Sequence, residues 1–134
     1  MDLVAIVLPA VGGLIAIAAG LFLIRAERRA RRPAKAEMGL MPTYTERAGG
    51  RFDGLNWTIP FVRVATFPQF VSISCITHEI QLRRGEVTAI EKERHLLSTG
   101  LRIRHTRPDL PSALILWPRN KARLEAELRA SLLA

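Results

Sequence analysis

The first two dozen residues form one continuous apolar stretch. Leu3 to Ile24 reads LVAIVLPAVGGLIAIAAGLFLI and contains no charged or strongly polar side chain. With the rise of an α-helix, this stretch spans about 33 Å, which is enough to cross the hydrocarbon core of a bilayer. Pro9 and the three glycines are tolerated in bilayer helices, where no water competes for the backbone groups. The pattern therefore predicts a transmembrane helix.

Positive charges flank this stretch on one side only. Met1-Asp2 precedes it without Lys or Arg, whereas RAERRARRPAK follows it. The positive-inside rule then places the N-terminus outside and residues 25–134 in the cytoplasm, so we expect a single-pass protein of the inner (plasma) membrane. The competing interpretation is a secretory signal peptide, which needs a basic start, a shorter apolar run and a cleavage site. The sequence has neither a basic start nor a shorter apolar run, and it shows no convincing cleavage site.

Small residues recur every four positions within the apolar stretch. Gly12, Ala16 and Gly20 lie on one face of the expected helix, where they permit close approach of a second transmembrane helix. Gly and Ala are also simply frequent in membrane helices. Both a helix-packing face and ordinary membrane composition remain open interpretations.

Basic residues cluster directly after the apolar stretch. Six of them stand against the single acidic Glu27: Arg25, Arg28, Arg29, Arg31, Arg32 and Lys35. We expect the helix to continue through this cluster until Pro33, so that residues 1–32 form the transmembrane helix with a basic cytoplasmic extension. The main expected role of the cluster is to fix orientation at the membrane surface. Attraction of anionic lipid head groups, about 1 kcal/mol per basic residue, follows from the same position.

The polar part of the chain begins with a segment of irregular pattern. Residues 33–50 are rich in Pro, Gly and Thr, which predicts a linker. From residue 51 onward, short runs of β-branched and aromatic residues alternate with turn residues, which is typical of a compact β domain over 51–134. The first expected strands are 52–59, ended by Pro60, then 61–67, ended by Pro68, then 70–76 and 80–83.

The second half of this domain adds strands and a final helix. Residues 87–94 fit a strand or a helix, 101–105 alternate strictly between apolar and basic side chains, and 113–117 form an apolar run typical of a buried strand. The final helix has Asn120 as its expected N-cap and a leucine at every fourth position, namely Leu124, Leu128 and Leu132. The total is about six or seven strands and one amphipathic helix.

This order of elements resembles a pleckstrin-homology-like (PH-like) barrel, and the chain resembles small bacterial membrane proteins that carry such a domain behind an N-terminal span. The resemblance rests on residues 51–134, in the segments LNWTIPFVRV, VSIS, GEVTAIEKER, STGLRIRH and ALILWPRNKARLEAEL. It implies a mainly-β PH-like barrel closed by a C-terminal amphipathic helix and a binding role. It supplies no ligand.

The distribution of charge argues against a nucleic-acid partner. The chain carries a formal net charge of +8, and the excess is concentrated beside the apolar stretch, where a membrane surface would use it. A second basic patch is expected on the domain if its arginines gather, together with His105: Arg83, Arg84, Arg102, Arg104 and Arg107. With an aromatic share of 6% and no aromatic residues interleaved with these arginines, base stacking is not expected. The patch would instead face lipid or an acidic protein surface.

The sequence offers no catalytic constellation. His78, His95 and His105 are far apart and lack a cysteine partner at zinc spacing, and Cys75 is the single cysteine. The glycine-rich and serine motifs of nucleotide-binding and hydrolytic enzymes are missing. We therefore expect no metal, no cofactor and no enzyme activity.

Two functional hypotheses follow. The first is a noncatalytic binding or adaptor module that is anchored at the cytoplasmic membrane face and contacts lipids or, preferably, another membrane protein. The second is an accessory structural subunit of a larger membrane complex, docked through the face of Gly12, Ala16 and Gly20.

Overall fold

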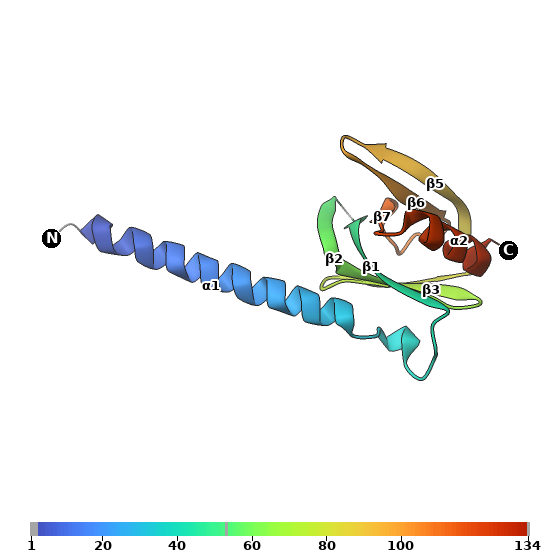
Figure 1. Ribbon diagram of the computed structural model, residues 1–134, viewed down its shortest axis with the longest axis horizontal. Helices are drawn as coiled ribbons and strands as arrows, with labels where there is room; N and C mark the ends of the chain where they lie inside the picture. Colours follow the sequence, from blue (N-terminus) through green and yellow to red (C-terminus); the bar gives the residue numbers. More distant parts are fainter. Residues whose placement is uncertain (1–2, 53, 134) are drawn as a thin grey trace.

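A long helix leads into a curled antiparallel sheet that a second helix covers (Figure 1). The computed structural model describes residues 3–52 and 54–133. The elements, in chain order, are α1 (Leu3–Arg31), the 3-10 helix η1 (Lys35–Glu37), β1 (Tyr44–Phe52), β2 (Leu55–Thr66), β3 (Phe70–Ser74), β4 (Glu79–Arg83), β5 (Val87–His95), β6 (Ser98–His105), β7 (Leu114–Trp117) and α2 (Lys121–Leu132).

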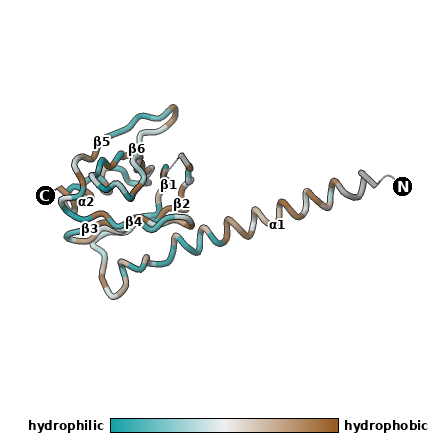
Figure 2. The backbone as a smooth tube through the Cα atoms, turned by 180° about the vertical axis from the view of Figure 1, so that it is seen from behind, coloured by the Kyte–Doolittle hydropathy of each residue, from teal (hydrophilic) through white to brown (hydrophobic). Residues whose placement is uncertain are grey.

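Helix α1 confirms the expected apolar helix and its extension beyond Ile24. It runs without a break to Arg31 and stops before Pro33, whose ring disfavours helix at the preceding residue. Figure 2 shows its hydrophobic residues over most of its length and hydrophilic ones toward the sheet. From Leu8 to Ile24 no residue of the apolar part is buried, as expected for a membrane anchor or for a signal sequence.

The seven strands form one antiparallel sheet in the order β4-β3-β2-β1-β7-β6-β5. Strands β1–β4 and β5–β7 are two meanders, and the pairing of β1 with β7 joins them through Gly49 opposite Trp117 and Gly50 opposite Leu116. The sheet curls into a half-barrel with β4 and β5 as its edges. The fold class expected from the sequence, a mainly-β barrel closed by a C-terminal helix, is confirmed.

The core lies between the concave face of the sheet and α2. The side chains of Leu124, Leu128 and Leu132 are at most 1% exposed and pack with sheet residues such as Val64 and Ile103. The helix begins where predicted, since the Asn120 side chain accepts a hydrogen bond from the backbone N–H of Arg123. The apolar stripe of α2 therefore closes the half-barrel.

Two glycines permit close approach between neighbouring strands. A Cβ at Gly49 would lie 2.7 Å from the backbone oxygen of Trp57, and one at Gly100 would lie 2.9 Å from that of Leu116. Such distances leave no room for a side chain. These glycines are therefore explained by packing within the sheet.

The sequence pattern misplaced the first two strands. Strand β1 begins at Tyr44, inside the segment 33–50 that was expected to be a linker, and β2 runs continuously through Pro60 instead of stopping there. The turn between them includes Gly54, whose φ of +80° suits glycine. A proline interrupts a strand where its missing N–H would be needed for pairing. The pairing of β1 with β2 is irregular near Pro60, because the register shifts there, so the strand can continue through the proline. Residues 87–94, ambiguous by pattern, belong to strand β5.

Candidate functional site

The end of α1 packs directly on the outer face of the half-barrel. Ala26, Ala30 and Ala34 are at most 2% exposed, and α1 contacts β2. Ala26 and Ala30 lie one helical turn apart, and their small side chains let the helix approach the sheet closely. Helix α1 and the domain therefore share a packed interface beyond their covalent connection.

Ion pairs surround this alanine contact. Arg29 pairs with Glu79 at the start of β4, and Glu27 accepts from Arg31 at 2.5 Å and lies 3.7 Å from Arg47 on β1. These pairs are partly exposed, so each contributes little to stability but helps to fix the direction in which the helix leaves the sheet.

One further ion pair at this junction has a buried carboxylate. Glu37 in η1 is 2% exposed at its side chain and accepts three hydrogen bonds from the Arg63 guanidinium, of which the shortest is 2.8 Å. Arg63 lies on β2, so the pair fastens the connection after α1 to the sheet. The pair resists separation because the Glu37 carboxylate alone would be buried without compensation.

Four of the six predicted membrane-surface residues converge beside this junction. Arg25, Arg28, Arg29 and Arg32 line a shallow cavity of about 440 Å³ together with Ile76 from the turn after β3. Their spacing places them on one side of α1. Of the remaining two, Arg31 pairs with Glu27, and Lys35 lies in η1 beside a different cavity. We call the first four residues the arginine cluster; its chemistry suits phosphate groups.

The predicted helix-packing residues lie on the exposed apolar part of α1. Within the described residues, a Cβ added at Gly12 or Gly20 would meet nothing within 4 Å, and Ala16 is exposed. The face is open to lipid or to another helix.

The predicted basic patch on the domain is divided among three places. Arg102 and Arg104 lie on β6 and pair across the ladder with Glu93 at 3.1 Å and Glu91 at 2.8 Å. The Arg84 guanidinium donates to the carbonyls of Ala130 and Ser131 and so caps the end of α2. Arg83 and Arg107 line a cavity on the open side of the half-barrel, and His105 Nε2 donates to the neighbouring Pro111 carbonyl at 2.8 Å.

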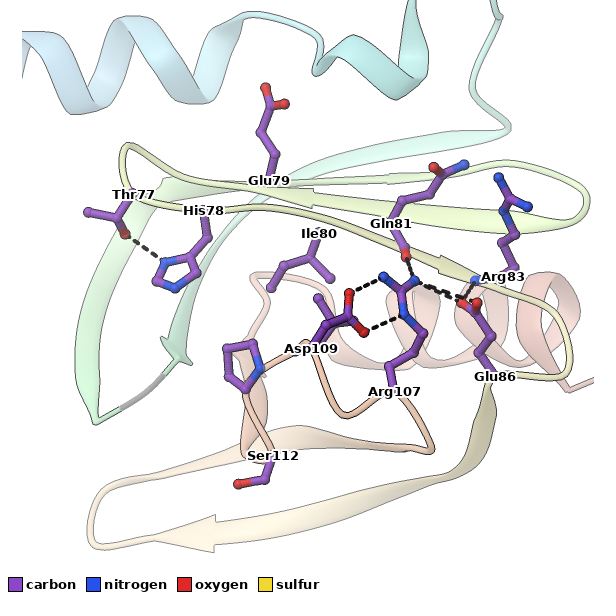
Figure 3. A pocket seen from close by; sticks show the side chains of 12 residues that line it. Thr77, His78, Glu79, Ile80, Gln81, Arg83, Glu86, Arg107, Asp109 and Ser112 are labelled. Atoms are coloured by element: carbon purple, nitrogen blue, oxygen red, sulfur yellow. Dashed lines mark hydrogen bonds and ion pairs between the residues drawn. The ribbon is translucent and has the colours of Figure 1, made fainter.

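That cavity has a volume of about 990 Å³ and lies between β4 and the segment after β6 (Figure 3). Arg107 points into it and is held by Asp109 through two hydrogen bonds of 2.8 and 2.5 Å, by the Gln81 carbonyl at 3.2 Å and by Glu86 at 3.4 Å. The guanidinium thus covers part of the β4 edge. We call this cavity the open-side pocket; it is polar and carries both signs of charge.

Acid is expected to release the segment after β6 only at low pH. The Arg107 guanidinium holds the pKa of the Asp109 carboxyl below its usual value. A carboxyl whose pKa is lowered by folding stabilises the folded state at pH values above its unfolded-state pKa of about 3.9. This contribution is lost as the pH falls through the lowered, folded-state pKa. The Arg107 Nε–H NMR resonance should therefore stay unchanged from about pH 8 to about pH 5 and shift only in stronger acid. In Asp109→Asn the acid shift should vanish; a shift near neutral pH in the unchanged chain would contradict the assignment.

Polar side chains contact one another in the turn between β3 and β4, near this pocket. The Thr77 hydroxyl lies 2.8 Å from His78 Nδ1 and 3.4 Å from Cys75 Sγ, and the Cys75 N–H donates to the His78 carbonyl. These contacts are local to the turn between β3 and β4, which they hold together. Within the described part of the chain, no three His, Cys, Asp or Glu side chains gather as a metal would require.

Sequence reasoning missed the Glu37–Arg63 pair and the open-side pocket. Both bring together residues from distant segments, and no local period marks them. The unpatterned connection after Pro33 was the available clue, since an acidic residue stands there shortly after a run of basic ones.

No family model, no curated protein and no solved structure matches this chain.

Proposed function

We propose that this protein is a noncatalytic binding or adaptor module of the inner (plasma) membrane, with α1 spanning the bilayer, its N-terminus outside and the half-barrel in the cytoplasm. The observation that carries the proposal is the packing of α1 on the sheet through Ala26, Ala30 and the ion pairs around them. A helix that leaves a bilayer and continues as part of the domain interface holds that domain at a set height and angle.

The arginine cluster supports this position. It lies at the first turns of α1 beyond the apolar stretch, where lipid phosphates would be. Each arginine near an anionic surface contributes about 1 kcal/mol of attraction, so the cluster stabilises the cytoplasmic placement. Arg29 is already paired with Glu79, which leaves Arg25, Arg28 and Arg32 as the principal contacts with head groups.

We take the binding partner to be another membrane protein. The open-side pocket is polar and bounded by the edge strand β4, a surface that suits a hydrophilic protein segment. Because α1 fixes the domain, the pocket is presented at a constant distance from the membrane. A PH-like binding module of this design acts by holding its partner and does not need to catalyse a reaction.

Topology is tested by labelling with a membrane-impermeant maleimide. In a Cys75→Ser background, Met41→Cys provides a thiol at a side chain that is 91% exposed. Labelling is expected in inverted membrane vesicles and not in right-side-out vesicles. The reverse pattern would overturn the orientation, and release of the chain from the membrane by alkaline carbonate would overturn the span.

Mild-detergent purification followed by mass spectrometry then identifies the partner. A membrane protein recovered at fixed stoichiometry should be lost from Arg83→Glu, which alters the open-side pocket, and retained by Lys121→Glu, which changes the same charge at the start of α2. Equal recovery with both variants would remove the pocket as the partner site.

The open face of Gly12, Ala16 and Gly20 favours a second candidate function, an accessory subunit docked through its transmembrane helix. The double change Gly12→Leu and Gly20→Leu is expected to abolish co-purification with the complex, because the added side chains keep the backbones apart. Ala10→Leu with Ala18→Leu adds comparable bulk on the opposite face and should leave co-purification intact. If the glycine variant still associates fully, this face is not a docking site.

A further inference from the structure

The hairpin between β5 and β6 carries two fully exposed leucines at its tip. Leu96 is 95% exposed and Leu97 is 100% exposed, and they form the turn between the paired residues His95 and Ser98. Two-residue hairpin turns favour Asn-Gly, Asp-Gly and similar pairs, because their backbone twist requires them. Leucine favours neither the backbone conformation of such a turn nor the solubility of the protein. Their presence indicates an apolar environment around the tip.

The tip points to the side of the half-barrel from which the apolar part of α1 leaves. In Figure 1 the β5–β6 hairpin projects from the top of the domain with its turn toward the N-terminal end of α1, and Figure 2 shows the same direction from behind. The start of β2 also lies on this side. We call this the membrane-facing side.

An aromatic contact fixes the level of this side relative to the bilayer. Trp57, near the start of β2, stacks on Phe22 of α1 with ring centroids 6.0 Å apart and planes at 22°. Phe22 lies three positions before Arg25, in the last apolar turn of the helix. Leu55 and Ile59 flank Trp57 and are 53% and 39% exposed. Aromatic residues prefer this boundary between hydrocarbon and head groups, so β2 begins at the membrane surface.

The charges of the hairpin are compatible with an anionic surface. Its two carboxylates, Glu91 and Glu93, are paired with Arg104 and Arg102 on the opposite strand, and Arg94 and His95 next to the tip are exposed. Basic side chains beside an apolar tip are typical of segments that dip into the head-group region.

We infer that the β5–β6 hairpin inserts Leu96 and Leu97 into the cytoplasmic leaflet of the membrane that α1 spans, giving the domain a second attachment. The inference rests on the proposed function, since it requires α1 to cross the bilayer. The lipid leaflet is the occupant because the packed junction between α1 and the sheet holds the tip on the side of the bilayer. The domain is then held at two separate points, and the second attachment reinforces the orientation that the packed junction sets.

Fluorescence quenching in lipid nanodiscs tests this insertion. The full chain carries Cys75→Ser and Leu97→Cys, and the introduced thiol is labelled with an environment-sensitive fluorophore. The nanodiscs contain phosphatidylcholine and phosphatidylglycerol, with or without a nitroxide on the acyl chain. The label at position 97 is expected to show blue-shifted emission and to lose intensity when the nitroxide lipid is present. Met41→Cys, also exposed but in the connection after α1, should show neither change.

A label at Leu14→Cys separates failure of this inference from failure of the proposed function. If the label at 14 is quenched and that at 97 is not, α1 spans the bilayer and the hairpin does not insert. If neither is quenched, the span itself is wrong. A blue shift at 97 without nitroxide quenching means that a protein surface, such as a second copy, covers the tip, and this also overturns insertion.

A matched variant tests whether the leucines cause the insertion. Leu96→Asn with Leu97→Gly keeps a favoured two-residue turn and removes both apolar side chains. A label at Ser98→Cys should be quenched by the nitroxide lipid in the otherwise unchanged hairpin and should lose that quenching in the Asn-Gly variant. Equal quenching in both would show that the leucines do not hold the tip in the leaflet.

Discussion

Replacing Arg63 with methionine is expected to lower the free energy of unfolding by about 3 kcal/mol, because it leaves the buried Glu37 carboxylate without its partner. The Glu37 side chain is only 2% exposed, so water does not compensate it. The measurement is denaturant unfolding in mild detergent, followed by the fluorescence of the two tryptophans.

Two further variants sharpen this result. Arg104→Met removes one partner of a surface pair whose side chains are 52% and 46% exposed, and it should change stability by less than about 1 kcal/mol. Glu37→Met combined with Arg63→Met removes the buried carboxylate together with its partner and should recover most of the lost stability. If Arg63→Met and Arg104→Met have equal effects, the pair at Glu37 is not buried in solution.

Replacing Leu128 with alanine is expected to destabilise the protein by about 3 kcal/mol, because the change opens a cavity between α2 and the sheet. Leu128 is fully buried in the stripe that closes the half-barrel. Thermal unfolding monitored by circular dichroism measures the effect.

Leu40→Ala is the matched control for this change. Leu40 lies in the connection after η1 and is 50% exposed, so the same truncation should cost less than about 1 kcal/mol. A small effect at Leu128 would mean that α2 does not close the core, and the barrel would then lack the helix on which its fold class depends.

The packed junction fixes how the domain sits on α1. A domain on a loose linker samples many orientations, whereas one held by buried alanines and the Glu37–Arg63 pair keeps one orientation relative to the helix. The Phe22–Trp57 contact belongs to the same arrangement. Under the proposed function, the partner would meet the open-side pocket in a constant orientation, which reduces the entropy lost on binding.

Much of the architecture followed from local pattern. The apolar run ending at Ile24 and the arginines after it predicted α1, strict alternation predicted β6, and leucines at every fourth position with Asn120 predicted α2. Strand β1 was missed because its residues, YTERAGGRF, lack the alternation of a half-buried strand. The close approach of β1 to β2 requires glycines, and glycines are also typical of a linker.

The sequence by itself determined that this protein has an apolar helix with positive charge on one side and a β domain closed by a helix. These properties follow from periodicity and charge order, which act over a few neighbouring residues. The tertiary structure alone decided that the linker contains β1, that Glu37 meets Arg63, that the domain arginines are divided among separate partners, and that the turn of the β5–β6 hairpin lies toward the N-terminal end of α1. Each of these depends on how the sheet curls and on where α1 packs against it. Such contacts join residues far apart in the chain, so no local pattern records them.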